Sequence, residues 1–149
     1  MGLGDSEVER FLAHSMVARV AALSPSGRPF MTPLWFASHR GRVHLPTGQT
    51  TLVVRYVSAQ PSVVLLFDAE QDQPSGRVLR LGGTATVHPG NPSLPVLLRI
   101  ARKYYLSSVS RGIVAHMRHY SLLRQYYGQG GGPAVLEVAP QAAEFLERP

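Results

Sequence analysis

Short apolar runs separated by tight-turn residues dominate the first ninety residues of this 149-residue chain. The runs are rich in β-branched and small apolar side chains, and Ser24-Pro25-Ser26-Gly27 between the first two is strong turn chemistry. This pattern is typical of antiparallel strands joined by hairpins. It predicts six strands, at residues 16–23, 28–37, 42–46, 63–67, 77–88 and 133–138. A small closed or partly closed barrel accommodates such strands without exposed edges.

The second predicted strand carries different side chains on its two faces, because alternate residues of a strand point to opposite sides. One face has Phe30, Thr32, Leu34 and Phe36, and the other has Met31, Pro33 and Trp35. The first three strands are predicted to form a meander in which each pairs with the next. Within the fifth strand, Gly82-Gly83 predicts a bulge or a close approach of another backbone.

Four helices are predicted around these strands. They cover residues 6–14, residues 50–59, a segment that opens at Asn91-Pro92-Ser93 and runs through Tyr105, and residues 111–127. The apolar stripe expected to pack the third helix on the core is Leu94, Leu97, Leu98, Ala101, Tyr104 and Tyr105. The predicted fold class is therefore mainly β, a six-stranded antiparallel barrel with peripheral helices, in one domain over residues 1–149.

The charges are unevenly placed along the chain. Fifteen Lys and Arg against nine Asp and Glu give a net charge of +6, and fourteen of the fifteen bases are Arg. Residues 10–67 and 73–136 contain no Asp or Glu but carry six and eight bases. A site within these stretches cannot use paired carboxylates or carboxylate-bound magnesium. The basic excess favours an anionic partner.

Several other site classes are excluded by composition. The chain has no cysteine, which removes disulfides, thiolate catalysis, Cys-ligated zinc and iron–sulfur clusters. No secretory signal and no membrane span are visible, so a cytoplasmic protein is expected. The basic run Arg99, Arg102, Lys103 and Arg111 lacks any nucleic-acid reading head. We expect it on the solvent face of its helix, where it can steer an anionic cofactor tail, and we expect no nucleic-acid partner.

The order of elements over residues 10–90 resembles the pyridoxamine 5′-phosphate oxidase-like, flavin-binding split-barrel family, in its actinobacterial branch that uses FMN or the deazaflavin coenzyme F420. The segments that carry the resemblance are Val17-Ala18-Arg19-Val20-Ala21-Ala22-Leu23, the turn Ser24 to Pro29, Met31-Thr32-Pro33-Leu34-Trp35-Phe36, Leu45-Pro46-Thr47-Gly48, Val54-Arg55-Tyr56-Val57 and Gln60-Pro61-Ser62-Val63. No single motif among them is diagnostic, but the order of elements over eighty residues is hard to match by chance.

The resemblance implies a six-stranded split barrel, a homodimer with flavin in grooves at the subunit interface, and an oxidoreductase that passes a hydride to a small organic substrate. The residues implied nearest the flavin ring are Met31, Thr32, Pro33, Leu34 and Trp35. Those implied at the cofactor phosphate are Thr47, Gly48, Thr50, Thr51 and Arg55. The phosphate is expected where free N–H groups and the helix dipole favour an anion. No catalytic residue and no metal ligand is assigned.

One position departs from the family pattern. Family members that bind cofactor commonly carry a Lys at the head of this helix, and the matching position here is Val53. Loss of one charge-assisted contact costs on the order of 1.5–3 kcal/mol, so weaker binding of FMN or F420 is expected.

Two alternatives stay open. One is a non-catalytic relative that has lost flavin and holds an apolar ligand or nothing. The other is a haem-binding relative that would use His116 and His119, which are spaced i, i+3 on a predicted helix. Trp35 has a plain reading as a core or interface residue besides its place near a cofactor.

Overall fold

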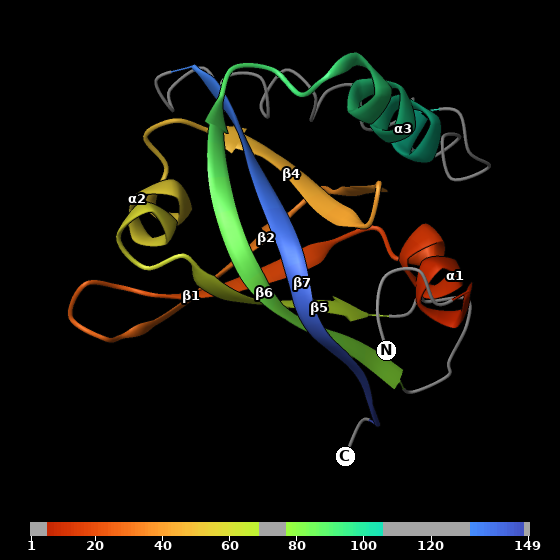
Figure 1. Cartoon of the computed structure of the whole chain (residues 1–149), viewed down its shortest axis with the longest axis horizontal. Coiled ribbons are helices and arrows are strands. Elements are labelled where there is room, and N and C mark those ends of the chain that lie inside the picture. The colour runs from red at the N-terminus through yellow and green to blue at the C-terminus, as the bar shows by residue number, and fades with distance from the viewer. Residues whose placement is uncertain (1–5, 69–76, 106–131, 148–149) are drawn as a thin grey trace.

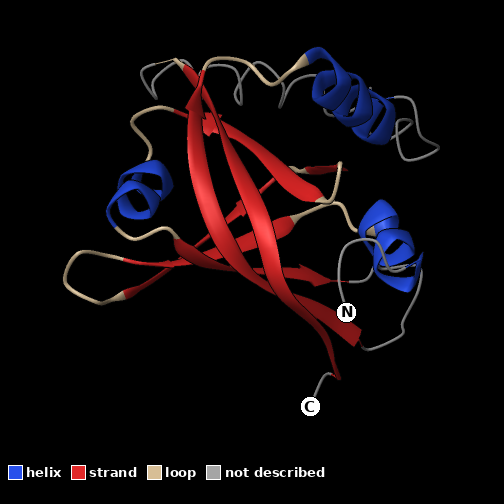
Figure 2. Cartoon of the chain, in the orientation of Figure 1, coloured by secondary structure: helices blue, strands red, loops and turns tan. Residues whose placement is uncertain are grey.

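The computed structural model describes residues 6–68, 77–105 and 132–147. Seven strands form one antiparallel sheet, and three helices lie at its periphery (Figures 1 and 2). The strands are β1 (Ala18–Leu23), β2 (Pro29–Leu34), β3 (Ala37–His39), β4 (Arg42–Gly48), β5 (Ser62–Asp68), β6 (Arg77–Pro89) and β7 (Pro133–Glu147). The helices are α1 (Ser6–His14), α2 (Leu52–Ala59) and α3 (Leu94–Tyr105). This mainly β, antiparallel architecture confirms the predicted fold class.

The strand order is β2-β1-β5-β6-β7-β4-β3. Strands β2 and β3 follow each other in the chain but stand at the two opposite edges of the sheet. The sheet is therefore curled but not closed by hydrogen bonds, and the two residues Trp35 and Phe36 carry the chain across the opening. One predicted strand at 28–37 is thus two strands, which is why the sheet has seven strands where six were predicted.

The predicted meander is wrong in its third strand. β1 pairs with β2, with Val20 opposite Thr32, but β4 pairs with β3 and with β7. Sequence proximity suggested a hairpin, whereas the partner that β4 finds is the last strand of the described chain. Val43 of β4 lies opposite Val138 of β7. Such a pairing has no local signal.

The principal core lies between the strands and is closed by α1 and α2. Its fully buried side chains include Leu12, Val20, Phe36, Leu45, Leu65, Phe67, Leu79, Leu81 and Leu136. The alternation predicted for β2 is confirmed: Leu34 is buried and Met31 is 52% exposed. Helix α1 begins and ends where predicted, and Val8 and Leu12 are its buried face.

A second, smaller core attaches α3. It consists of Ala37, Val96, Ile100 and Tyr104, with Met16 and Trp35 packed against it. The predicted stripe of α3 is confirmed at Tyr104 and is wrong at Leu94, Leu97 and Leu98, which are 68%, 41% and 61% exposed. The helix carries two apolar stripes, and it packs through the one that brings the Tyr104 hydroxyl to the backbone of the β2–β3 link.

No helix in the described ranges has the length and apolar character needed to cross a membrane. The helix predicted at 111–127 lies outside those ranges.

The β6–β7 pair contains the bulge that Gly82-Gly83 predicted. The register shifts between Gly82 and Gly83, so that Gly82 lies opposite Ala142 and Gly83 opposite Pro140. A Cβ on Gly83 would stand 2.4 Å from the carbonyl oxygen of Ala139, whereas a Cβ on Gly82 would meet nothing within 4 Å. β7 also continues to Glu147, nine residues beyond the predicted end at 138. Ala139–Glu147 lacks the β-branched residues that mark strands, and pairing with β6 determines its conformation.

Gly83→Ala is expected to lower the free energy of unfolding by about 1–3 kcal/mol, because the new methyl group forces the β7 backbone away. The matched control is Gly82→Ala, which introduces no contact and is expected to change stability by less than about 0.5 kcal/mol. Chemical denaturation of both variants checks this. Equal losses in the two variants would contradict the close approach at Gly83.

Candidate functional site

The strand predicted to lie under the cofactor ring, β2, is one edge of the sheet. None of the other described strands pairs with the backbone groups on its outer side, and an edge of this kind can pair with a ligand or another chain. Met31 and Pro33 are exposed, while Thr32 is half-buried and Leu34 is buried. Of the five residues implied near the ring, Leu34 therefore presents only its backbone.

Trp35 takes a structural role that its position in the sequence left open. Its ring stacks on that of buried Tyr104, with centroids 4.5 Å apart and planes inclined by 9°. The Tyr104 hydroxyl donates to the carbonyl oxygen of Met16 at 2.7 Å and accepts from the N–H of Phe36 at 3.1 Å. Trp35 remains half-buried, so one part of its surface packs on α3 while the rest borders solvent next to β2.

The residues predicted at the cofactor phosphate form the turn between β4 and α2. Thr47 is buried at the end of β4, and its Oγ1 lies 3.2 Å from Oγ1 of Thr51. The Thr51 hydroxyl donates to the carbonyl oxygen of Gly48 at 2.9 Å. The turn is tied to β7 because Gln49 donates through its backbone N–H to Gly132 and through Nε2 to Pro133.

The first turn of α2 is left without a side-chain cap. Thr51 is its N-cap in extended conformation (φ −67°, ψ 156°), but its side chain makes no hydrogen bond to the helix N–H groups. The first N–H groups of a helix have no intrahelical partner and attract anions. Thr50 is exposed beside them, and exposed Arg55 lies one turn further on. These groups suit an anionic oxygen ligand.

Val53, the residue at the expected lysine position, is 2% exposed and belongs to the principal core. The first-turn residue that faces solvent is Leu52, which is 46% exposed. The exposed position in the first turn of α2 is therefore apolar. The cation nearest to it on this helix is Arg55, three residues further on.

An aromatic contact joins β2 to α2. Phe30 of β2 and Tyr56 of α2 meet edge to face, with ring centroids 5.2 Å apart. Helix α2 lies on the opposite side of the molecule from α1 and α3 (Figure 1). The predicted ring residues thus lie on β2 and directly after it, and the predicted phosphate residues extend from the end of β4 through the turn to Arg55 of α2.

A histidine cluster that the sequence did not reveal lies on the outer face of β3, β4, β6 and β7. Glu137 accepts from Nε2 of His88 at 2.6 Å and is contacted by Arg42 at 3.3 Å. His44 stands opposite Glu137 in the β4–β7 register, and its ring centroid is 6.1 Å from that of His39. These histidines lie on different strands, and the β3–β4, β4–β7 and β6–β7 pairings bring them together.

The cluster shifts two titrations. Burial lowers the pKa of His44 below its ordinary value of 6.5, against the opposing effect of Glu137. For Glu137, burial raises the pKa, but the hydrogen bond from His88 and the charge of Arg42 outweigh it and bring the pKa below 4.5. Nothing in the described ranges gathers three or more potential metal ligands into a metal site. His116 and His119 lie outside those ranges.

Comparison with protein families gives one match: the model described as pyridoxamine 5′-phosphate oxidase covers residues 5–146. The chain belongs to the pyridoxamine 5′-phosphate oxidase family. No curated protein matches it.

Solved structures with this fold are similar at low sequence identity. An F420 reductase shares 18% identity with a TM-score of 0.65, over 91% of this chain and 94% of the reductase. A conserved hypothetical protein from Mycobacterium tuberculosis shares 16% identity with a TM-score of 0.68, over 97% of this chain and 84% of that protein. A heme binding protein from Mycobacterium smegmatis shares 13% identity with a TM-score of 0.61, over 93% of this chain and 52% of that protein. At such identities the likeness is one of fold.

Stability is expected to fall in two steps as the pH is lowered. The folded state disfavours protonated His44, so stability decreases as the pH falls below 6.5, where the unfolded chain takes up the proton. The folded state favours ionised Glu137, so its contribution is present above 4.5 and is lost as the pH falls through its lowered pKa. Urea denaturation over this pH range measures both steps.

His44→Gln should remove the first step and Glu137→Gln the second. His14→Gln serves as the control, since His14 is exposed at the end of α1 and lies outside the cluster. An unchanged pH profile in the His44 variant would show that the His44 environment is the same in the folded and unfolded chains.

Proposed function

We propose that this member of the pyridoxamine 5′-phosphate oxidase family is a homodimeric oxidoreductase that binds FMN or the deazaflavin F420 and passes a hydride to a small organic substrate. The observation that carries the proposal is the family match over residues 5–146. The uncapped start of α2 and the free edge of β2 add to it, because they are open where the cofactor phosphate and ring are expected.

The residues fit the cofactor in chemical type. Thr50, Thr51 and Arg55 would hold the phosphate together with the first N–H groups of α2. Thr47 and Gly48 would shape the turn behind it, since both are buried. The outer edge of β2 from Met31 to Trp35 would hold the ring. The bound cofactor would supply the redox chemistry, which leaves to this chain the tasks of binding and orienting.

A dimer is supported by the face of β1 and β2 that points away from the core. The register places Leu23 opposite Pro29 and Ala21 opposite Met31. Leu23 is 39% exposed and Met31 is 52% exposed. Exposed apolar side chains that gather on one face of a sheet are a feature of interaction sites. Because this face belongs to the same strand as the ring residues, a partner seated there would also cover the cofactor.

A relative without flavin is the second candidate, and one observation favours it. The exposed first-turn residue of α2 is the apolar Leu52, so Arg55 is the only cation that α2 offers near the turn. A colourless purified protein that fails to bind either cofactor at tens of micromolar would support this candidate and exclude the oxidoreductase.

Arg55→Gln is expected to weaken FMN or F420 binding by about tenfold or more, since it removes a charge-assisted contact. Leu52→Lys is expected to strengthen binding, because it adds a cation on the exposed face of α2. Fluorescence titration with each cofactor measures both effects. Arg10→Gln on α1 is the control. Val53→Lys is expected to destabilise the fold, because the residue is buried and its charge would lose water.

Met31→Glu is expected to shift the protein from dimer to monomer and to weaken cofactor binding with it. A charge at this position costs little in the monomer because the side chain is 52% exposed, but it would be desolvated under a partner. Sedimentation velocity measures the change. Leu94→Glu on α3, where the side chain is 68% exposed, is the matched control. A wild-type chain that sediments as a monomer would refute the dimer.

A further inference from the structure

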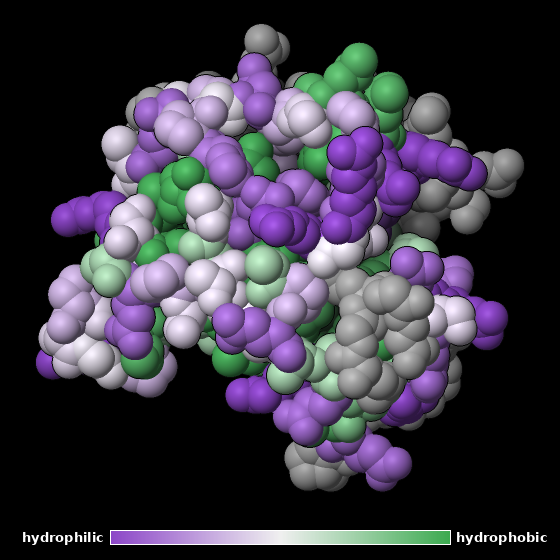
Figure 3. Space-filling model, viewed as in Figure 1, coloured by the Kyte–Doolittle hydropathy of each residue, from purple (hydrophilic) through white to green (hydrophobic). Residues whose placement is uncertain are grey.

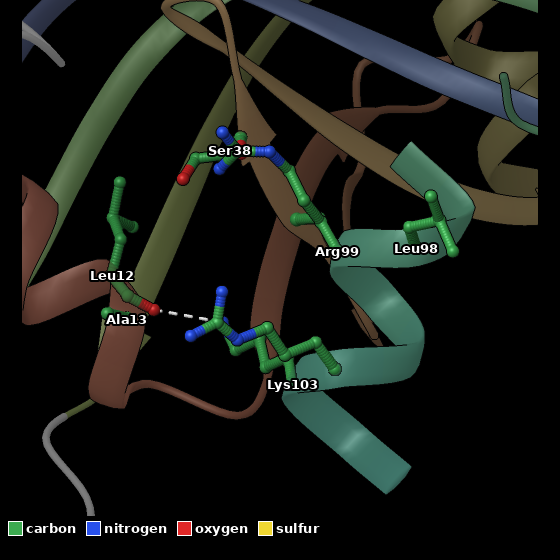
Figure 4. A pocket seen from close by; sticks show the side chains of 8 residues that line it. Leu12, Ala13, Ser38, Leu98, Arg99 and Lys103 are labelled. Atoms are coloured by element: carbon green, nitrogen blue, oxygen red, sulfur yellow. Dashed lines mark hydrogen bonds between the residues drawn. The ribbon is translucent and has the colours of Figure 1, made fainter. Parts of the chain in front are cut away.

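A basic cavity lies between α1, β3 and α3, away from α2. Its volume is about 580 Å³, and its walls are formed by Leu12, Ala13, Ala37, Ser38, Leu98, Arg99, Arg102 and Lys103 (Figure 4). Three of these eight side chains are cations and none is a carboxylate. The volume falls within the usual range of small-molecule sites.

The two arginines of this cavity differ from other arginines of the described structure in their ion pairing. Arg19, Arg42, Arg77 and Arg80 each form an ion pair with a carboxylate. Within the part of the chain that the structure describes, Arg99 and Arg102 pair with none. They are three residues apart on α3, so both extend from one side of the helix. Strongly hydrophilic side chains gather on the side of α3 that faces α1 (Figure 3).

The cavity is braced by hydrogen bonds between its three elements. Arg99 donates through one Nη to the carbonyl oxygen of Ser38 at 3.1 Å, which joins α3 to β3 and leaves the rest of its guanidinium for other contacts. Lys103 Nζ donates to the carbonyl oxygen of Leu12 at 2.9 Å and lies 3.5 Å from the centroid of the Phe36 ring. The charged groups of Arg99 and Lys103 are therefore held in place by the fold. A ligand would have to order only the side chain of Arg102.

A neighbouring cavity of about 330 Å³ continues the space past Ala13, Ser38 and Arg99. Its wall contains His39, Arg40 and one carboxylate, Glu9. The Nδ1 atom of His39 is buried and has no hydrogen-bond partner in the described structure. The acidic side chain lies in this second cavity and not in the first, so the first is the place where an anion meets cations alone.

We propose that the larger cavity binds a small dianionic organic ligand, a phosphate monoester or a dicarboxylate. Paired guanidinium groups and an ammonium match a compact group of two negative charges. Leu98, which is 61% exposed, supplies an apolar side chain on which the organic part of the ligand would pack. An inorganic anion would contact the cations of the site but not its apolar side chain. A monoanion would neutralise only part of the positive charge.

The site does not depend on the cofactor proposal. It is formed by α1, β3 and α3, whereas the phosphate of FMN or F420 is proposed at the turn before α2. A chain that binds neither cofactor can still bind the dianion, and loss of one property leaves the other measurable.

The experiment is calorimetric titration of the full chain at fixed ionic strength with phenyl phosphate, inorganic phosphate, succinate and phenol. Phenyl phosphate should bind more tightly than inorganic phosphate, and neutral phenol should not bind. Tight binding of phenyl phosphate identifies a phosphate monoester as the ligand class, and tighter binding of succinate identifies a dicarboxylate. If every dianion binds more weakly than about 1 mM (about −4 kcal/mol), the proposal is overturned.

Arg102→Gln should weaken dianion binding by about tenfold or more. This variant removes no hydrogen bond of the described structure, so its fold should remain intact. Arg28→Gln, in the exposed β1–β2 turn, is the matched control and should bind as the wild type does. Arg55→Gln should weaken FMN or F420 binding but leave dianion binding unchanged. Wild-type affinity for the dianion in Arg102→Gln would refute this site. A loss of dianion binding in Arg55→Gln would also refute it and would place the anion at the α2 turn.

Discussion

The opening between β2 and β3 is the constraint on which the rest of the structure depends. These strands are consecutive in the chain but occupy opposite edges of the sheet, so the short link between them must cross the gap in the barrel. The Tyr104 hydroxyl hydrogen-bonds the carbonyl oxygen of Met16, just before β1, and the N–H of Phe36, within the link. A buried backbone group without a partner costs about 1–3 kcal/mol. These hydrogen bonds and the apolar packing of Val96, Ile100 and Tyr104 together attach α3 to the link.

Much of the fold could be predicted from local sequence, and the failures share one cause. The N-terminal helix, the β1–β2 hairpin and the bulge at Gly82-Gly83 follow from helical periodicity, turn chemistry and glycine chemistry, each of which acts over a few residues. The pairing of β4 with β7 joins residues such as Val43 and Val138, and no local pattern encodes it. The predictions for the end of β7 and for the buried face of α3 were wrong for the same reason, since a partner distant in sequence determines each of them.

The candidate site shows the same division. Sequence and family resemblance selected two segments, Met31–Trp35 and the stretch from Thr47 to Arg55. The first lies on and directly after β2, the second runs from the end of β4 into α2, and β2 and α2 meet through Phe30 and Tyr56. It could not be foreseen that Val53 faces the core while Leu52 faces solvent, because both suit a helix start. The histidine cluster around Glu137 and the basic cavity beside α3 were also hidden, since each draws residues from three or more elements.

The acid-free stretches of sequence have a different meaning in three dimensions. Arg19 and Arg42 lie far from any carboxylate along the chain, but the fold brings Asp68 and Glu137 to them. All four arginines that pair with carboxylates lie on strands next to β5 or β7, and three of them pair with a carboxylate on β5 or β7. Among the described residues, Arg55 of α2 and Arg99 and Arg102 of α3 form no ion pair with a carboxylate. These three arginines lie at the two anion sites that we propose.

The place of β7 in the sheet has a consequence for how the chain reaches its native state. β7 is the last strand in the chain, yet it lies between β6 and β4 and pairs with both. Until residues 133–147 have been synthesised, β6 and β4 each present an unpaired edge, which is a template for association with other chains. Pairings over such sequence separations are slow to form. Folding on the ribosome would therefore stop at an incomplete sheet, and the final step would be the insertion of one strand into its middle.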